Sequence, residues 1–198
     1  MNIAVFASHG GSDLQAILDG CRTKAIPAQV TAVISNNGDS MALIRAEREG
    51  VPAYHLSAKQ LGSEETLAGE ILRVLQEHRT DMIFLAGYMR LLHPSVLRRY
   101  RGRIFNIHPA LLPKYGGKGM YGMHVHEAVI AAGETESGVT IHRVSEEYDS
   151  GEIVAQTTVP VLPWDTAESL AARVLEREHT FLVEVIARIA AGEIRLGQ

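Results

Sequence analysis

The chain has 198 residues, of which 46% are hydrophobic and 21% charged, and its formal net charge is -4. This length and composition are typical of one globular domain with a sizeable core, so we expect residues 1–198 to form a single domain. The sequence has neither a basic surplus nor a basic stripe, which argues against a nucleic-acid or anionic-membrane partner.

The N-terminus and the cysteine content indicate where the protein resides. Cys21 is the only cysteine, which excludes an internal disulfide. The apolar start is too short for a signal peptide and lacks basic residues, and no apolar run approaches the roughly 20 residues that cross a bilayer. These features predict a soluble cytoplasmic protein, either a monomer or a homodimer.

The first half of the sequence alternates strand and helix patterns. Apolar stretches predict strands at residues 3–7, 30–34, 51–55, 82–86 and 103–107. Between them lie helix patterns at residues 14–21, from Ser40 to Gly50, and from Ser63 through Leu75. This alternation predicts a doubly wound, mainly parallel α/β sheet.

The last part of the sequence departs from this alternation. Residues 139–144 and 153–159 alternate apolar and polar side chains, which predicts an antiparallel pair at the edge of the sheet. Asp165 and Glu168 have the spacing of a capping box and open a long C-terminal helix that ends near residue 191. We expect Trp164 to pack near the start of this helix.

Glycines follow the first predicted strand, where open parallel sheets bind ligands. Gly10 and Gly11 permit a tight turn, and free amides at the start of the next helix would face an anion such as phosphate. The spacing matches neither the dinucleotide fingerprint nor the phosphate loop of nucleotide hydrolases. A phosphate site and a plain strand–helix turn both fit this segment.

Asn106 and His108 stand at the end of the fifth predicted strand, just before Pro109. Residues two apart on a strand point to the same side, so both side chains can face one pocket. An amide beside an imidazole can stabilise the oxygen charge of a tetrahedral intermediate, and a nearby carboxylate would keep the imidazole protonated or relay a proton. A structural histidine is the alternative, since the chain has 9 histidines.

Glu178 interrupts the apolar face of the last predicted helix. A carboxylate there is costly unless it is paired. Either Glu178 binds a charged partner, or the helix end leaves the core and Glu178 reaches water.

Two further features follow His108 in the sequence. His124 and His126 form a His-x-His pair, but no third ligand has the expected spacing, so no metal is expected. The glycine-rich segment 116–122 fits either a mobile lid over the site or a surface loop.

Several segments carry a resemblance to a known family. They are residues 8–15, 87–90, 106–113 with the string Asn-Ile-His-Pro-Ala-Leu-Leu-Pro, and 138–151 with Thr140, His142 and Asp149. Over nearly its full length the chain resembles the folate-dependent phosphoribosylglycinamide formyltransferases. The string at 106–113 is shared across folate formyltransferases, whereas the combination of all segments with the chain length indicates this group.

The resemblance implies a Rossmann-like formyltransferase fold and a specific reaction. The formyl group of 10-formyltetrahydrofolate would pass to the amine of glycinamide ribonucleotide, giving formylglycinamide ribonucleotide and tetrahydrofolate in purine synthesis. Asn106 and protonated His108 would stabilise the oxyanion. Asp149 would raise the pKa of His108 and help to move a proton, through water, from the amine to the folate nitrogen.

The resemblance also implies the binding residues. Nucleotide-binding positions correspond to Gly11, Ser12 and Asp13 for the phosphate, to Gly87, and to Glu178 for the glycinamide amine. Folate-binding positions correspond to Met89, Arg90, Leu91, Leu92 and Asn106.

Two positions depart from the family pattern. Asp13 replaces an asparagine and would repel the phosphate if its carboxylate pointed inward. Glu64 stands where some relatives have a basic residue near the folate tail.

Alternatives to this interpretation are another enzyme that uses 10-formyltetrahydrofolate, a non-catalytic sensor of phosphate ligands, and a metal-dependent hydrolase. A formyltransferase acting on initiator methionyl-tRNA and a formylfolate hydrolase would ordinarily carry an additional domain, for which we expect no room.

Overall fold

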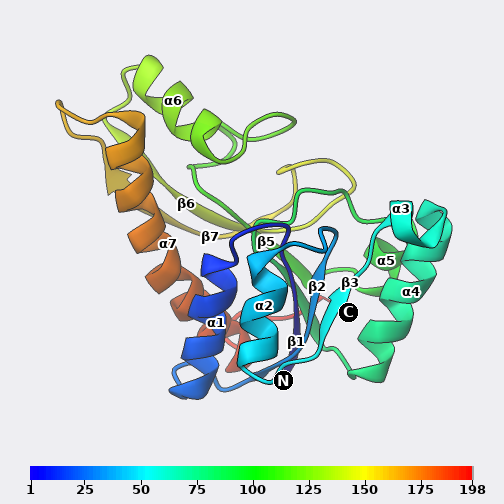
Figure 1. Ribbon diagram of the computed structural model, residues 1–198. Coiled ribbons are helices and arrows are strands. Elements are labelled where there is room, and N and C mark those ends of the chain that lie inside the picture. Colours follow the sequence, from blue (N-terminus) through cyan, green and yellow to red (C-terminus); the bar gives the residue numbers. More distant parts are fainter. Residues whose placement is uncertain (198) are drawn as a thin grey trace.

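A seven-stranded sheet forms the centre of the protein (Figure 1), as described by a computed structural model over residues 1–197. Its strands are β1 (Asn2–Phe6), β2 (Gln29–Ser35), β3 (Ala53–His55), β4 (Met82–Leu85), β5 (Ile104–His108), β6 (Glu136–Arg143) and β7 (Ile153–Pro160). Their order is β3-β2-β1-β4-β5-β6-β7. β1 to β5 pair in parallel, while β6 and β7 are antiparallel additions. The predicted fold class, with its antiparallel edge pair, is confirmed.

Helices cover both faces of the sheet. They are α1 (Ser12–Arg22), α2 (Met41–Arg48), α3 (Ala58–Leu61), α4 (Glu64–Glu77), α5 (Pro94–Arg99), α6 (Met123–Ala131) and α7 (Ala167–Ala190). α1, α2 and α7 pack on one face, and α4 and α5 on the other (Figure 1). Within the described residues, none of the helices combines the length and apolarity that crossing a membrane requires.

β1 shows why the central strands are continuously apolar. Ile3 and Val5 belong to the core beneath α1 and α7, whereas Ala4 and Phe6 belong to the core beneath α4 and α5. Successive side chains of a strand point to opposite faces, so a strand with helices on both sides must be apolar at every position. This burial fixes the sheet from which the site is built.

The third strand is shorter at its start than predicted. The Val51 amide donates to the Ala46 carbonyl and so completes the end of α2. Pro52 follows, and its nitrogen has no hydrogen to donate to a neighbouring strand. The pairing with β2 therefore starts at Ala53.

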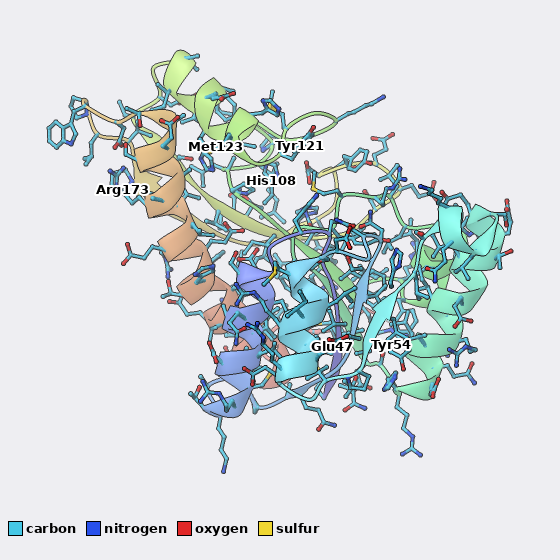
Figure 2. All side chains as sticks on the ribbon, viewed as in Figure 1. Glu47, Tyr54, His108, Tyr121, Met123 and Arg173 are labelled. Carbon is cyan, nitrogen blue, oxygen red and sulfur yellow. The ribbon has the colours of Figure 1, made fainter. Side chains whose placement is uncertain are left out.

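The start of α7 lies one residue later than predicted. Thr166 is the N-cap, and its capping box is closed by Ser169, so the predicted box of Asp165 and Glu168 is wrong. The Asp165 carboxylate instead accepts two hydrogen bonds from the guanidinium of Arg173, which is labelled in Figure 2. The predicted packing of Trp164 is also wrong, because this residue is 76% exposed.

Candidate active site

A cavity of about 360 Å³ opens at the carboxyl ends of β4 and β5. Parallel α/β sheets ordinarily bind ligands at this edge. The cavity brings together most of the predicted site residues: Asp13, Gly87, Met89, Arg90, Leu91, Leu92, Asn106, His108, Asp149 and Glu178. Gly11 and Ser12 are not among its walls and adjoin it through Asp13.

The glycine turn before α1 is held by α2. Gly11 is the N-cap of α1 with a φ of 68°, and a Cβ added there would lie 2.9 Å from the Ala42 Cα. The Ser40 hydroxyl donates to the His9 carbonyl at 2.8 Å, and the Arg45 Nε donates to the Gly10 carbonyl at 2.9 Å. The turn is therefore rigid, and the start of α1 keeps free amides of the kind that bind phosphate.

Ser8 joins the ends of β1 and β4. Its amide donates to the Gly87 carbonyl at 3.1 Å, and its hydroxyl accepts from the Met89 amide at 2.8 Å. Gly87 has a φ of 72°, which turns the chain sharply after β4. Ser8 thus orients the segment at 87–92 that forms the predicted folate wall, a role that the sequence did not reveal.

Asn106, His142 and Asp149 form a polar group on one side of the cavity. The His142 Nδ1 lies 2.9 Å from the Arg143 carbonyl, which can only accept, so Nδ1 carries a proton. The His142 Nε2 then accepts from the Asn106 Nδ2 at 3.0 Å and lies 3.5 Å from the Asp149 Oδ1. These contacts fix the Asn106 amide so that its nitrogen is a donor at the cavity wall.

The imidazole of His108 is fixed in the same way. Its Nε2 donates to the Tyr115 carbonyl at 2.7 Å, which leaves Nδ1 facing the Asp149 Oδ2 at 3.7 Å. Burial lowers the pKa of His108, and the charge of Asp149 and the Tyr115 carbonyl raise it by less. Asp149 acts in the expected direction, but the expectation that it keeps His108 protonated is not met in the free protein because burial outweighs it.

Asp149 stays ionised despite its partial burial. Burial raises its pKa, but the neighbouring His142, the His108 charge and the Gly117 amide together lower it below its ordinary value. Its φ of 52° is an unusual backbone conformation for a residue other than glycine. The backbone therefore holds this carboxylate against the two histidines.

Glu178 and Asp13 also line the cavity. Glu178 is only 7% exposed, so the alternative in which the helix end carries it into water is wrong. Burial and the neighbouring Asp13 raise its pKa well above the ordinary value. Asp13 turns toward α7, where its Oδ1 lies 3.5 Å from the His179 Nε2.

The glycine-rich segment is bonded to the polar group. The Gly117 amide donates to the Asp149 Oδ2 at 2.9 Å, and residues 117–122 line the cavity. Figure 2 shows Tyr121 close to His108, and both line this cavity. The Tyr115 hydroxyl donates to Glu134 at 2.8 Å, which anchors the start of the segment. The loop thus forms part of the wall, and its movement as a lid stays a prediction.

A second cavity, of about 1080 Å³, adjoins the first along Tyr88, Arg90, Leu91, Leu92 and Tyr148. Glu64 lies in its wall, so the departure from the family pattern falls outside the catalytic cavity. No group of three or more His, Cys, Asp or Glu side chains that could hold a metal ion occurs within residues 1–197. His124 lies 3.4 Å from Glu127, and His126 is buried.

The chain is similar in sequence and fold to known formyltransferases. The family model described as formyl transferase matches residues 1–186. The phosphoribosylglycinamide formyltransferase of Escherichia coli is 38% identical over 196 residues, which cover 99% of this chain and 90% of the relative. The crystal structure of glycinamide ribonucleotide transformylase 1 from Symbiobacterium toebii has a TM-score of 0.89 and 39% identity, and the match covers 97% of this chain and 88% of that one.

Other relatives are longer. A chloroplastic phosphoribosylglycinamide formyltransferase of Arabidopsis thaliana is 41% identical over 194 residues, which cover 98% of this chain but 66% of the relative. The chain therefore belongs to the formyl transferase family and, within it, to the phosphoribosylglycinamide formyltransferases, as the resemblance predicted. The roles of individual site residues rest on the geometry given above.

Proposed function

We propose that the chain transfers the formyl group of 10-formyltetrahydrofolate to the amine of glycinamide ribonucleotide, with Asn106, His108 and Asp149 carrying out the chemistry. The products are formylglycinamide ribonucleotide and tetrahydrofolate, in de novo purine synthesis. The observation that carries the residue roles is the convergence of an amide donor, an imidazole and an ionised carboxylate on one cavity. The names of the relatives support the reaction.

The transfer needs stabilisation of one oxygen and movement of one proton. The amine nitrogen attacks the formyl carbon, and the formyl oxygen gains negative charge as the tetrahedral intermediate forms. The Asn106 amide and the protonated fraction of His108 stabilise this charge, because fixed donors are most effective where charge develops. With the Nε2 proton held by Tyr115, the acidic proton of His108 is the one on Nδ1.

Asp149 moves the proton. Its Oδ2 lies 3.7 Å from the His108 Nδ1, too far for a direct hydrogen bond, so a water between them fits the distance. Through this water the carboxylate takes a proton from the attacking nitrogen and returns it to the folate nitrogen. The bond between that nitrogen and the formyl carbon then breaks, and tetrahydrofolate leaves.

Different segments of the chain bind the two substrates. The amides of Gly11, Ser12 and Asp13 bind the nucleotide phosphate, and Glu178 binds the glycinamide amine. Gly87 lines the cavity beside them, and Met89 to Leu92 offer backbone groups to the folate ring. No step of this reaction requires a metal ion.

The test is an absorbance assay for tetrahydrofolate, with the nucleotide and the folate omitted in turn. Product only when both are present supports the proposal. Product without the nucleotide indicates a formylfolate hydrolase, and no product from folded protein refutes the function. His108→Ala should lose turnover while it still binds the nucleotide, whereas unchanged turnover removes His108 from the mechanism.

Other properties of the protein stay predictions. They are a single domain over residues 1–198, a monomer or homodimer, a cytoplasmic location, and no nucleic-acid or membrane partner. The net charge of -4 supports the last of these.

A further inference from the structure

The steps of formyl transfer leave Asp13 and His179 without a role in proton movement. Asp13 lies in the first turn of α1, and Glu178 and His179 lie on α7, which packs against α1. Asp13 and Glu178 line the catalytic cavity together with Asn106, His142 and Asp149. Asp13 is also a position at which this chain departs from the family pattern.

The two carboxyl groups act on each other. Asp13 and Glu178 line the same cavity, and the charge of Asp13 raises the pKa of Glu178. Two buried carboxyl groups that repel each other in this way do not both ionise, so we expect the pair to hold one proton. Burial raises the pKa of both groups, and like charges this close also oppose full ionisation.

His179 connects this pair to solvent. The Asp13 Oδ1 and the His179 Nε2 are both buried and have no hydrogen-bond partner within the described residues, and they lie 3.5 Å apart. The His179 side chain as a whole is 35% exposed, whereas the Asp13 side chain is 13% exposed. An imidazole that touches a buried carboxyl at one end and water at the other can carry a proton outward.

We propose that Asp13, Glu178 and His179 form a proton exit that converts the glycinamide ammonium into the neutral, nucleophilic amine. This inference rests on the proposed function. An amine beside a carbonyl group resembles an α-amino group, which titrates at about 7.7–8.0, so most of the nucleotide arrives as the ammonium. The ammonium has no lone pair and cannot attack the formyl carbon.

The proton balance is complete. The ammonium N–H bond breaks as its proton passes to the carboxyl pair, and the pair gives its shared proton through His179 to water. The pair keeps one proton, the bound amine is neutral, and one proton leaves the protein. Asp149 and His108 then handle only the proton that is released during the transfer itself.

Among the described residues, the other charged groups of the cavity do not contact the pair. On α1 and α7 the groups that act on the pair are the two carboxyls themselves and His179. The remaining charged or titratable side chains of the same cavity are Tyr88, Arg90, His108, Lys118, Tyr121, His142, Glu147, Tyr148 and Asp149. None of these is bonded to Asp13 or Glu178 within the described residues, so the pair exchanges its proton through His179.

The experiment is a calorimetric count of protons released when glycinamide ribonucleotide binds without folate, in buffers of different ionisation enthalpy at pH 7. The wild-type protein should release about one proton for each nucleotide bound, because most of the free amine is protonated at this pH. Asp13→Asn keeps the shape of the side chain and removes the shared proton. It should bind the ammonium to Glu178 and release almost none.

The matched control is Asp19→Asn on the same helix, where the carboxylate pairs with the exposed Arg22. It should behave as the wild type. A second readout is the Kd for the nucleotide at pH values below the pKa of the free amine. The wild type releases a proton on binding, so its Kd should fall about tenfold per pH unit, whereas the Kd of Asp13→Asn should change far less.

Failure of this proposal differs from failure of the function. A wild-type protein that binds the nucleotide and forms product but releases no proton overturns the proton exit. Equal release from Asp13→Asn and the wild type overturns it as well. A wild-type protein that neither binds the nucleotide nor forms product overturns the function on which the proposal rests.

Discussion

Thr140 offers a test of how the catalytic strand is held. It is fully buried on β6 and pairs in register with His108. Its hydroxyl donates to the Ala110 carbonyl at 2.6 Å and accepts from the Leu112 amide at 3.1 Å and from the Gln156 Nε2 at 2.9 Å. One oxygen therefore fixes the turn that follows His108.

Thr140→Val keeps the shape and removes this oxygen. The Ala110 carbonyl and the Leu112 amide lose a buried partner, at about 1–3 kcal/mol each, whereas Gln156 keeps its bond to the Leu112 carbonyl. The methyl group that replaces the hydroxyl is buried, which stabilises the folded state by about 1 kcal/mol. We expect the free energy of unfolding to fall by about 3 kcal/mol.

The control is Thr140→Ser, which keeps the hydroxyl and loses one buried methyl group. It should cost about 1 kcal/mol. Both variants would be compared with the wild type by urea denaturation followed by circular dichroism. If Thr140→Val is no less stable than Thr140→Ser, the hydroxyl does not hold this turn and the reasoning is refuted.

Further predictions concern the titratable groups and metal dependence. Asp149→Asn removes a charge that raises the pKa of His108, so the loss of kcat with rising pH should move to lower pH and kcat should fall about 10²–10⁴-fold; an unmoved limb in the pH profile would contradict this. Burial and Asp13 raise the pKa of Glu178, so the folded state holds a proton that the unfolded chain releases, and stability is lost as the pH rises through the folded-state pKa. Glu178→Gln should therefore be the more stable protein in alkaline urea titrations while its KM for the nucleotide rises, and a wild-type advantage there would argue against a protonated Glu178. Full turnover in a chelator is expected, and loss of turnover that added metal restores would reinstate the metal-dependent hydrolase.

Central strands such as β1 and β4 were predictable because burial on both faces makes them apolar at every position. The short helices α3 and α5 were not predicted, since 4 and 6 residues are too few to show a helical period. α6 was missed for another reason. Apolar side chains surround much of this helix, and it follows directly on a glycine-rich loop, so neither an amphipathic face nor a capping side chain marked its start.

Side chains at strand ends were equally predictable, as Asn106 and His108 show. The contacts of the Tyr115 carbonyl and the Gly117 amide were not predictable, because nearly every residue has these backbone groups and the sequence does not mark which of them bond to a site residue. The contact of Asp13 with Glu178 joins opposite ends of the chain, and only the docking of α1 on α7 creates it. The lowered pKa of His108 likewise depends on a depth of burial that its neighbours in the sequence do not encode.

The exposure of Trp164 determines how this protein can be observed in solution. It is the only tryptophan, and it is 76% exposed in the segment between β7 and α7. An indole already surrounded by water emits much as it does in an unfolded chain, so its fluorescence should change little on unfolding. For the same reason it is a fixed internal standard of concentration during a titration, against which a backbone signal can be scaled.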